Sequence, residues 1–233
     1  VIEYTKNLVC KTIKPKEQVY IAIDGPAPRA KMVQQRSRRF KKIQEEKIKE
    51  KIKKKYDIKT TESWNASANM SPGTSFMLKL TKRLSKEIKK GTFSEKNPGL
   101  YFILSSGDVP GEGEHKFMPF IRKLIKKNNE KEKKIVIYSG DADLIPLSIS
   151  TGKNNIYLCQ EFEPKRMKYL KGFDKSPFVY TNIDLLKKQL FNNLVKKMDF
   201  GKSISIRKFV NDYNFILSFG GNDFIHGLPF TKV

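Results

Sequence analysis

The sequence predicts an α/β fold in which a mostly parallel sheet is flanked by helices. Two observations support this prediction: short apolar runs rich in β-branched and aromatic residues recur along the chain, and segments with helical periodicity alternate with them. The chain has 233 residues, of which 38% are hydrophobic, and this is enough for one α/β domain with its own core. We therefore expect a single domain over residues 1–233.

Four apolar runs are predicted as buried strands, over residues 19–23, 100–104, 135–138 and 156–159. Such uninterrupted runs are typical of parallel strands that are covered on both faces. Each run leads into a segment that carries acidic residues. In a doubly wound sheet, ligands bind outside the carboxyl ends of the strands, so the order of the elements predicts that these acids converge.

Helices are predicted between and after the strands, over residues 29–55, 75–90, 115–127, 183–197 and 206–219. The segment 115–127 places Phe117, Ile121 and Leu124 on one face, as an amphipathic helix does. Two stretches are expected to be peripheral. One is a charged helix with a polar loop over 41–71, and the other is a long connection over 160–182 that contains Pro164 and Pro177.

The charge of the chain indicates a polyanionic partner. Lys and Arg number 47 against 24 Asp and Glu, which gives a formal net charge of +23. Such a field attracts nucleic acid, although a lysine-rich compositional bias explains much of the excess equally well. No apolar run is long enough to span a membrane, and no basic helix with apolar anchors indicates a membrane surface. Cys10 and Cys159 form no metal or redox motif, which favours an intracellular, reducing compartment, either the cytoplasm or the nucleus.

Six acidic residues are candidate ligands of catalytic metal ions. Hydrolysis of a phosphodiester needs activated water and neutralised charge, and two Mg²⁺ ions about 4 Å apart, held by carboxylates, supply both. Mn²⁺ is the alternative ion. The candidates are Asp24 after the first run, Glu112 and Glu114 in the GEGE segment, Asp141 and Asp143 in the DAD segment, and Asp223 in the GGND segment.

Each acid has a simpler structural explanation when it is considered by itself. Asp24, which precedes a Gly-Pro pair, is suited to cap the helix that follows. Glu112 and Glu114 are suited to the first turn of a helix, where negative charge is stabilised. Four separate segments nevertheless deliver an acid after an apolar run, and this recurrence favours metal binding for the set. His115 and His226 are expected to be structural rather than catalytic.

Lys31, Gln35, Arg38 and Arg39 are candidate ligands of a terminal phosphate. Their spacing places them on one face of the helix predicted over 29–55. Arg presents a planar fork of donors and Lys presents a point charge, and both suit a phosphate. From the spacing alone, a solvated basic face is the simpler interpretation.

Five segments, taken together, resemble the 5′→3′ exoribonucleases and occur in the order typical of that family. They are AIDGPAPRAKMVQQRSRRF, SPGTSFM, VPGEGEHKFMPFIR, GDADLI and GGNDFIHGLP. The resemblance implies a fold similar to that of PIN and flap nucleases. It also implies metal-site acids at Asp24, Glu112, Glu114, Asp141, Asp143 and Asp223, and a pocket for the 5′ phosphate at Lys31, Gln35, Arg38 and Arg39.

The chain also departs from the family pattern. Pro26 and Val33 differ from the residues usual in the family's first block, and neither is expected to touch metal. The family has an earlier strand with another active-site Asp, and a His that stacks on the first base, and neither is found before Tyr20. The family's long C-terminal region is not found after Val233. We therefore expect a fragment of the nuclease region that is incomplete at both ends.

The resemblance implies a metal-dependent 5′→3′ exoribonuclease that degrades single-stranded, 5′-monophosphorylated RNA to mononucleotides, as in mRNA decay. Two alternatives stay open. One is a catalytically inactive module that binds RNA 5′ ends. The other is a flap-type DNA nuclease of the same fold.

Overall fold

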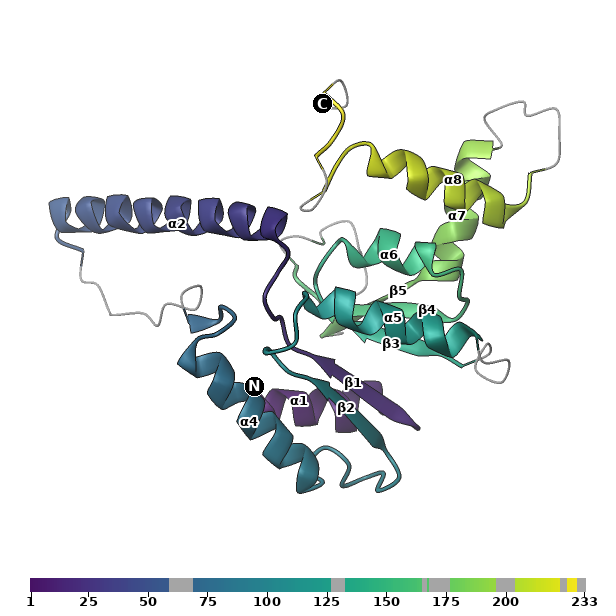
Figure 1. Ribbon diagram of the computed structural model, residues 1–233, viewed down its shortest axis with the longest axis horizontal. Coiled ribbons are helices and arrows are strands. Elements are labelled where there is room, and N and C mark those ends of the chain that lie inside the picture. The colour runs from purple at the N-terminus through teal and green to yellow at the C-terminus, as the bar shows by residue number, and fades with distance from the viewer. Residues whose placement is uncertain are drawn as a thin grey trace. The chain divides into compact units, whose positions relative to one another are not determined.

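The structure, a computed structural model, describes residues 1–58, 69–126, 133–164, 167, 177–195, 204–222 and 226–229. It combines helices with two small sheets (Figure 1), which confirms the predicted α/β class. Its contacts divide the chain into two compact units, Val1–Phe117 with Asn222–His226, and Met118–Gly221 with Gly227–Val233. The single domain expected over residues 1–233 stays a prediction.

The sheet of the first unit consists of two parallel strands. β1 (Gln18–Ala22) pairs with β2 (Tyr101–Ser105), in a register that aligns Ala22 with Ser105. The helix α1 (Ile2–Asn7), the π-helical turn η1 (Leu8–Ile13) and α4 (Ser75–Lys89) contribute to the same unit. Its core cluster is made of Val9, Cys10, Ile23, Met77, Leu84, Phe93 and Leu100.

Two helices of the first unit, α4 and α2, are stabilised in different ways. α4 begins where the Thr74 hydroxyl accepts a hydrogen bond from the N–H of Met77, and its apolar stripe is buried at Met77 and Leu84. α2 (Arg29–Lys55) is mostly charged, and among its residues, all of which the structure describes, Lys31 alone is buried. Helix propensity therefore contributes more to α2 than a packed stripe does.

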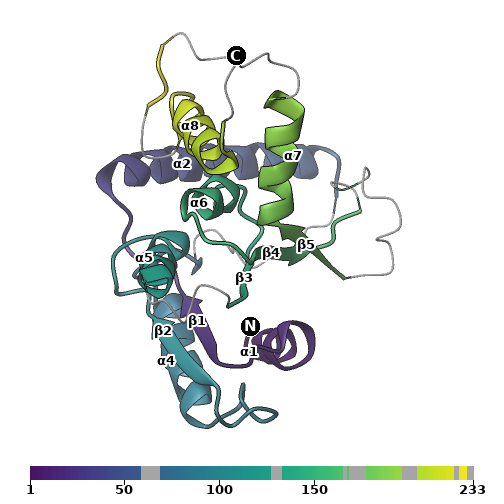
Figure 2. The ribbon, with the colours of Figure 1, turned by 90° about the vertical axis from the view of Figure 1, so that its right-hand side faces the viewer.

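The sheet of the second unit has three strands. β3 (Ile135–Tyr138) pairs in parallel with β4 (Ile156–Glu161), and β5 (Phe178–Asn182) pairs with β4 in the antiparallel sense. α6 (Leu144–Ser150) and α7 (Ile183–Val195) lie against this sheet, and α8 (Ile206–Ser218) packs on both helices (Figures 1 and 2). Leu144, Ile156, Cys159 and Ile183 are almost completely buried in this unit.

One helix links the two units along the chain. α5 (Gly113–Lys126) begins in the first unit and ends in the second. It follows directly on Glu112, whose carbonyl accepts a hydrogen bond from the N–H of Lys116 at 3.2 Å. Within the described part of the chain, no helix is both long and apolar enough to cross a membrane.

The predicted strands and helices are confirmed to within a few residues, but their assembly differs from the single doubly wound sheet that we expected. The described strands form two sheets, because β1 takes β2 as its partner whereas β3 takes β4. The alternation of elements along the chain predicts that strands pair, but the choice of partner depends on tertiary contacts.

The sequence prediction also missed short elements. β5 lies in the stretch 160–182 that was expected to be a connection; it buries Val179, leaves Tyr180 exposed and enters α7 without a turn that would mark its end. α6 has seven residues and contains Pro146, so it is too short for a periodic signal. The polar loop predicted within 41–71 falls partly on residues 59–68, which lie outside the described residues.

Candidate active site

The segments that follow β1 and β2 are joined by backbone hydrogen bonds. The N–H of Ile23 donates to the carbonyl of Ser105 at 3.0 Å, which extends the ladder by one residue beyond β1. Farther on, the N–H of Gly25 donates to the carbonyl of Gly111 at 3.0 Å, and the N–H of Gly111 donates to the carbonyl of Pro26 at 2.9 Å. The two loops therefore run together as far as the start of α5.

Gly25 allows this close approach because it has no side chain. A Cβ atom at this position would lie 1.9 Å from the carbonyl oxygen of Val109 and 3.0 Å from that of Gly107. Both are backbone atoms, so no side-chain rotation would relieve the overlap. The close contact of the two loops thus depends on glycine at this position.

Asp24 lies directly after β1, near the strand end where the sequence predicts it. Its side chain is bound by the helix that follows β2, α5. Its Oδ1 accepts a hydrogen bond of 2.7 Å from the N–H of Gly113, the first residue of α5. The alternative interpretation, a cap on α2, is wrong, because α2 begins after Pro28 and has no side-chain cap. Asp24 instead contacts the N-terminus of α5, where the helix dipole favours a carboxylate. Its Oδ2 is not used by that bond.

Glu112, Glu114 and His115 bring three ligand atoms together at the start of α5. One oxygen from each carboxylate and one ring nitrogen of His115 lie within 4.8 Å of one another. The Nδ1 of His115 lies 4.0 Å from Oε1 of Glu114, and Glu112 is buried with 7% of its surface exposed. Two carboxylates and an imidazole suit a divalent cation. The donor set therefore fits a metal ion by its chemistry, although only Glu112 of the three is buried.

Glu112 also contacts two of the residues predicted to bind phosphate. The Nζ of Lys31 lies 3.4 Å from Oε1 of Glu112, and the Nε2 of Gln35 donates to the same oxygen at 3.3 Å. Only about a tenth of each charged side chain in this pair is exposed to solvent. The helix α2 thus brings Lys31, in its first turn, to the carboxylate that precedes α5. The interpretation of Lys31 as part of a solvated basic face is therefore wrong.

A shallow hollow next to this contact is lined by both predicted residue sets. It has a volume of about 240 Å³ and lies between the α2 side chains and the segment that precedes α4. The lining residues are Asp24, Gln35, Arg38, Arg39, Lys42, Met70, Ser71 and Pro72. Arg38 and Arg39 are exposed, so their guanidinium groups are open to a ligand from solvent.

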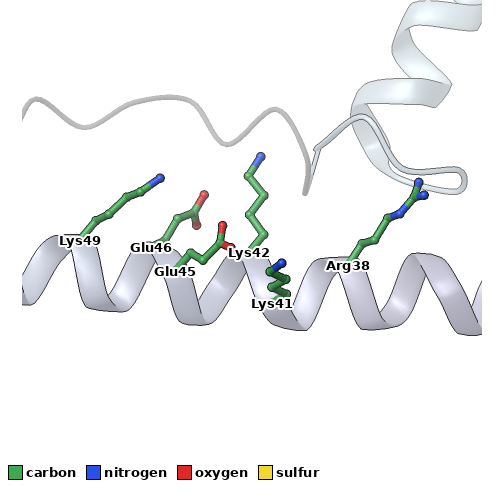
Figure 3. Close-up of a pocket in the computed structure, with 6 residues that line it drawn as sticks. All are labelled: Arg38, Lys41, Lys42, Glu45, Glu46 and Lys49. Atoms are coloured by element: carbon green, nitrogen blue, oxygen red, sulfur yellow. The ribbon is translucent and has the colours of Figure 1, made fainter. Parts of the chain in front are cut away.

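A second hollow of about 340 Å³ continues along α2. Arg38, Lys42 and Lys49 extend to the same side of the helix there, with Glu45 and Glu46 between them (Figure 3). Arg38 lines both hollows. The basic side chains of α2 therefore form a stripe that starts at Lys31 and continues along the helix.

In the second unit, Asp141 and Asp143 lie after the carboxyl end of β3, as predicted. The N–H of Asp141 donates to the hydroxyl of Ser139 at 3.2 Å, and Oδ1 of Asp141 accepts from the N–H of Asp143 at 3.0 Å. Asp143 is the residue before α6 and makes no capping bond with its side chain. The tight turn therefore brings both carboxylates to one strand end.

The structure brings the predicted acids together in two groups. Glu112 and Glu114 meet in the first unit, where Asp24 accepts from the N–H of Gly113 between them, and Asp141 and Asp143 lie together in the second. Asp223 lies outside the described residues. The convergence of all six on one site stays a prediction.

The family follows from comparison with known proteins. Residues 1–162 match the family model described as the XRN 5′-3′ exonuclease N-terminus. The chain belongs to this exonuclease family. The match covers more than half of the chain, and it confirms the resemblance drawn from the five sequence blocks.

Three relatives extend the likeness over nearly the whole chain. The chain is 36% identical over 228 residues to 5′-3′ exoribonuclease 1 of Saccharomyces cerevisiae, and 34% identical over 265 residues to 5′-3′ exoribonuclease 2 of Schizosaccharomyces pombe. It is 32% identical over 237 residues to 5′-3′ exoribonuclease 1 of Homo sapiens. These alignments cover 94%, 98% and 97% of this chain, but only 15%, 26% and 14% of the respective relatives.

Two residues of this XRN-family chain lie at the candidate site without having been singled out from the sequence. His115 was expected to be structural, which stays a prediction, and its ring nitrogen lies in the candidate ligand group at the start of α5. Lys116 was not considered at all. Its Nζ donates to the carbonyls of Ile23 and Ser106 at 2.6 and 2.8 Å. Their position directly after the GEGE segment is the only signal that the sequence offers.

The environment of Lys116 perturbs its protonation. Burial lowers the pKa of the Lys116 ammonium, whereas the carboxylates of Asp24 and Asp108 act in the opposite direction and favour the charged form. Its backbone is held as well, because the hydroxyl of Tyr20 donates to the carbonyl of Lys116 at 3.3 Å. From its position in α5, Lys116 therefore contacts β1, the segment after β1 and the loop after β2.

Proposed function

We propose that this chain is the core of a metal-dependent 5′→3′ exoribonuclease, which removes mononucleotides from RNA that carries a 5′-monophosphate. The observation that carries the proposal is the contact of Lys31 and Gln35 with Glu112. This contact joins the side chains proposed to bind the terminal phosphate to a proposed metal ligand. A terminal phosphate bound there lies beside the carboxylates, so the first internucleotide bond is the one presented for cleavage.

The proposed ligands of the divalent cations, Mg²⁺ with Mn²⁺ as the alternative, are Asp24, Glu112, Glu114, Asp141, Asp143 and Asp223. When bound, such cations neutralise charge on the scissile phosphate and make a water molecule a stronger nucleophile. The chain's own part is to orient these carboxylates. Gly113 holds Oδ1 of Asp24 from one side, and the N–H of Asp143 holds Oδ1 of Asp141.

The basic residues of α2 select the end of the substrate in this proposal. Lys31 is buried, and its ammonium is poorly solvated, so it interacts more strongly with a phosphate than an exposed lysine does. Arg38 and Arg39 supply planar donors that can bind two phosphate oxygens at once. A hollow of about 240 Å³ is large enough for a phosphate group.

The substrate class and the fold are proposed on the strength of the family. The relatives named above are exoribonucleases, and this supports RNA rather than flapped DNA as the substrate. A role in mRNA decay follows from the same likeness. The arrangement of a parallel sheet with acids after its strands supports a fold similar to that of PIN and flap nucleases.

The proposal is tested with matched substrates in Mg²⁺: RNA with a 5′-monophosphate, a 5′-hydroxyl or a 5′-triphosphate, and DNA of the same sequence. We expect mononucleotides to be released from the 5′-monophosphorylated RNA alone. Binding of this RNA without release would instead support an inactive end-binding module. A preference for flapped DNA would contradict both the exonuclease and the end-binding module.

A further inference from the structure

Lys116 connects the two strand ends that carry the proposed metal ligands. It lies in the first turn of α5, and side chains on a helix lean toward its N-terminus, so the ammonium reaches back toward the start of α5. There it donates to the carbonyl of Ile23, after β1, at 2.6 Å, and to that of Ser106, after β2, at 2.8 Å. Each of these is a short hydrogen bond from a charged donor.

The bond to Ile23 bears directly on Asp24. The carbonyl of Ile23 and the N–H of Asp24 belong to the same planar peptide group, so holding the carbonyl oxygen also orients the Cα of Asp24. Oδ1 of Asp24 is held separately by the N–H of Gly113. Together the two bonds fix the backbone and the side chain of Asp24 relative to α5.

The bond to Ser106 bears on the loop that leads to Glu112. The backbone ladder between β1 and β2 ends with the bond from Ile23 to Ser105. Beyond it, Lys116 bridges the two diverging chains with one ammonium group, before Gly25 and Gly111 rejoin them. A half-buried ammonium between two carbonyls thus takes the place of the next ladder step.

We propose that Lys116 is a positioning residue, which holds Asp24 and the loop before Glu112 in the arrangement that binds divalent cations. This proposal rests on the proposed function, because the cation site belongs to that function. Lys116 itself does not line the phosphate hollow. Its loss therefore weakens cation binding more than it weakens recognition of the 5′ end, in which Lys116 takes no direct part.

The test compares Lys116→Met with Lys123→Met, which removes an exposed lysine from the same helix. Binding of Mn²⁺ to the chain is measured by electron paramagnetic resonance of the free ion, and folding by circular dichroism. We expect Lys116→Met to weaken Mn²⁺ binding by about 10–100-fold, as loss of a group that orients metal ligands does elsewhere. Lys123→Met should bind Mn²⁺ like the parent chain. Binding of 5′-monophosphorylated RNA in EDTA should change by less than about threefold in Lys123→Met, which is under 0.7 kcal/mol at ~1.4 kcal/mol per factor of ten. In Lys116→Met it should weaken by a smaller factor than Mn²⁺ binding does.

Two further variants keep the test decisive. Lys116→Arg retains a charged donor and should recover most of the Mn²⁺ affinity. Lys116→Gln is polar enough for a half-buried position but too short to reach both carbonyls, so it should bind Mn²⁺ weakly. Parent-like Mn²⁺ binding by folded Lys116→Met or Lys116→Gln would overturn the proposal. An equal loss of Mn²⁺ affinity in Lys123→Met would also overturn it. So would the failure of both Lys116→Met and Lys116→Gln to fold, because the role of Lys116 would then be purely structural.

Amide exchange separates this proposal from the proposed function. In Lys116→Met we expect faster exchange at Gly113, whose N–H is bonded to Asp24, with no metal present. Unchanged exchange there would count against the positioning role. If the parent chain bound no Mn²⁺ or cleaved no RNA, the proposed function would fail, and the exchange of Gly113 would still decide the role of Lys116.

Discussion

At the scale of single residues, Glu112 contacts both the proposed phosphate-binding residues and the candidate metal ligands. Its buried carboxylate accepts from Gln35, lies beside Lys31 and belongs to the ligand group with Glu114 and His115. A buried carboxylate is stable only with such partners. Replacement of Glu112 would therefore disturb both parts of the site, so cleaner tests use residues that belong to one part alone.

Asp141 tests the metal assignment. We expect Asp141→Ala to lower the rate of cleavage by at least roughly 10²–10³-fold, which is the scale for losing one group that stabilises the transition state. RNA binding in EDTA should hardly change. Asp141→Asn is the matched variant, because its amide oxygen can still accept from the N–H of Asp143. An unchanged cleavage rate in either variant would show that Asp141 is no ligand.

Arg38 tests the choice of substrate end. Arg38→Ala should weaken binding of 5′-monophosphorylated RNA by about 10–100-fold, because a hydrogen bond to a charged group contributes about 1.5–3 kcal/mol. Binding of 5′-hydroxyl RNA should change far less. Arg36→Ala is the control: it removes the same charge from α2, but Arg36 lies over the ring of Phe40 and lines neither hollow. Equal losses for both RNA ends would contradict end selection by Arg38.

At the scale of elements, the site depends on how the loops after β1 and β2 meet α5. Pairing of β1 with β2 places the two loops side by side, and Gly25 and Gly111 join them by backbone hydrogen bonds. The N-terminus of α5 then donates a hydrogen bond to the carboxylate of Asp24. α2 adds its first two turns to this junction, through Lys31 and Gln35. The remaining turns of α2 carry exposed charge and do not contribute to the core.

Gly25 tests the importance of the loop contact. Gly25→Ala would place a Cβ 1.9 Å from the carbonyl of Val109, and we expect it to destabilise the chain by about 1–3 kcal/mol or more. Gly99→Ala is the control, since the nearest atom to its added Cβ is 3.8 Å away, on Asn97. The measurement is the free energy of unfolding in urea. Equal stability of the two variants would mean that the loops can separate at little cost.

At the scale of the whole molecule, the net charge of +23 determines how the chain meets a polyanion. Part of this charge lies on the face of α2 shown in Figure 3, where Arg38, Lys42 and Lys49 extend to one side together with Glu45 and Glu46. Exposed lysines interact with phosphates through a field that salt screens, whereas the buried Lys31 is screened much less. Attraction of RNA in general and selection of its 5′ end should therefore respond differently to salt.

This difference is measurable by fluorescence anisotropy with labelled single-stranded RNA. Between about 50 and 200 mM KCl, we expect affinity to fall about twentyfold, which corresponds to about three phosphate contacts at a slope of ~0.7 each. The ratio of affinities for 5′-monophosphate and 5′-hydroxyl ends should fall by less. Affinity independent of salt would indicate that the lysine excess is a compositional bias.

Local pattern was enough to predict most elements and the position of most acids. Helical periodicity anticipated α4 and α5, and apolar runs anticipated β1 to β4, because burial of one face or of both faces leaves a repeat in the sequence. β5 and α6 leave no such repeat, since β5 has five residues and α6 spans only about two turns. The same reasoning placed Asp24, Asp141 and Asp143 after strands.

By itself, the sequence determined the elements, the acids that end or follow them, and the family to which the blocks belong. Only the tertiary structure decided that the strands form two sheets, that Lys31 and Gln35 reach Glu112, and that Lys116 spans two strand ends. The partners in these contacts are far apart in the chain, 77 residues for Gln35 and Glu112 and 93 for Lys116 and Ile23. Period and propensity act over a few residues, whereas such contacts form only when packing brings distant segments together.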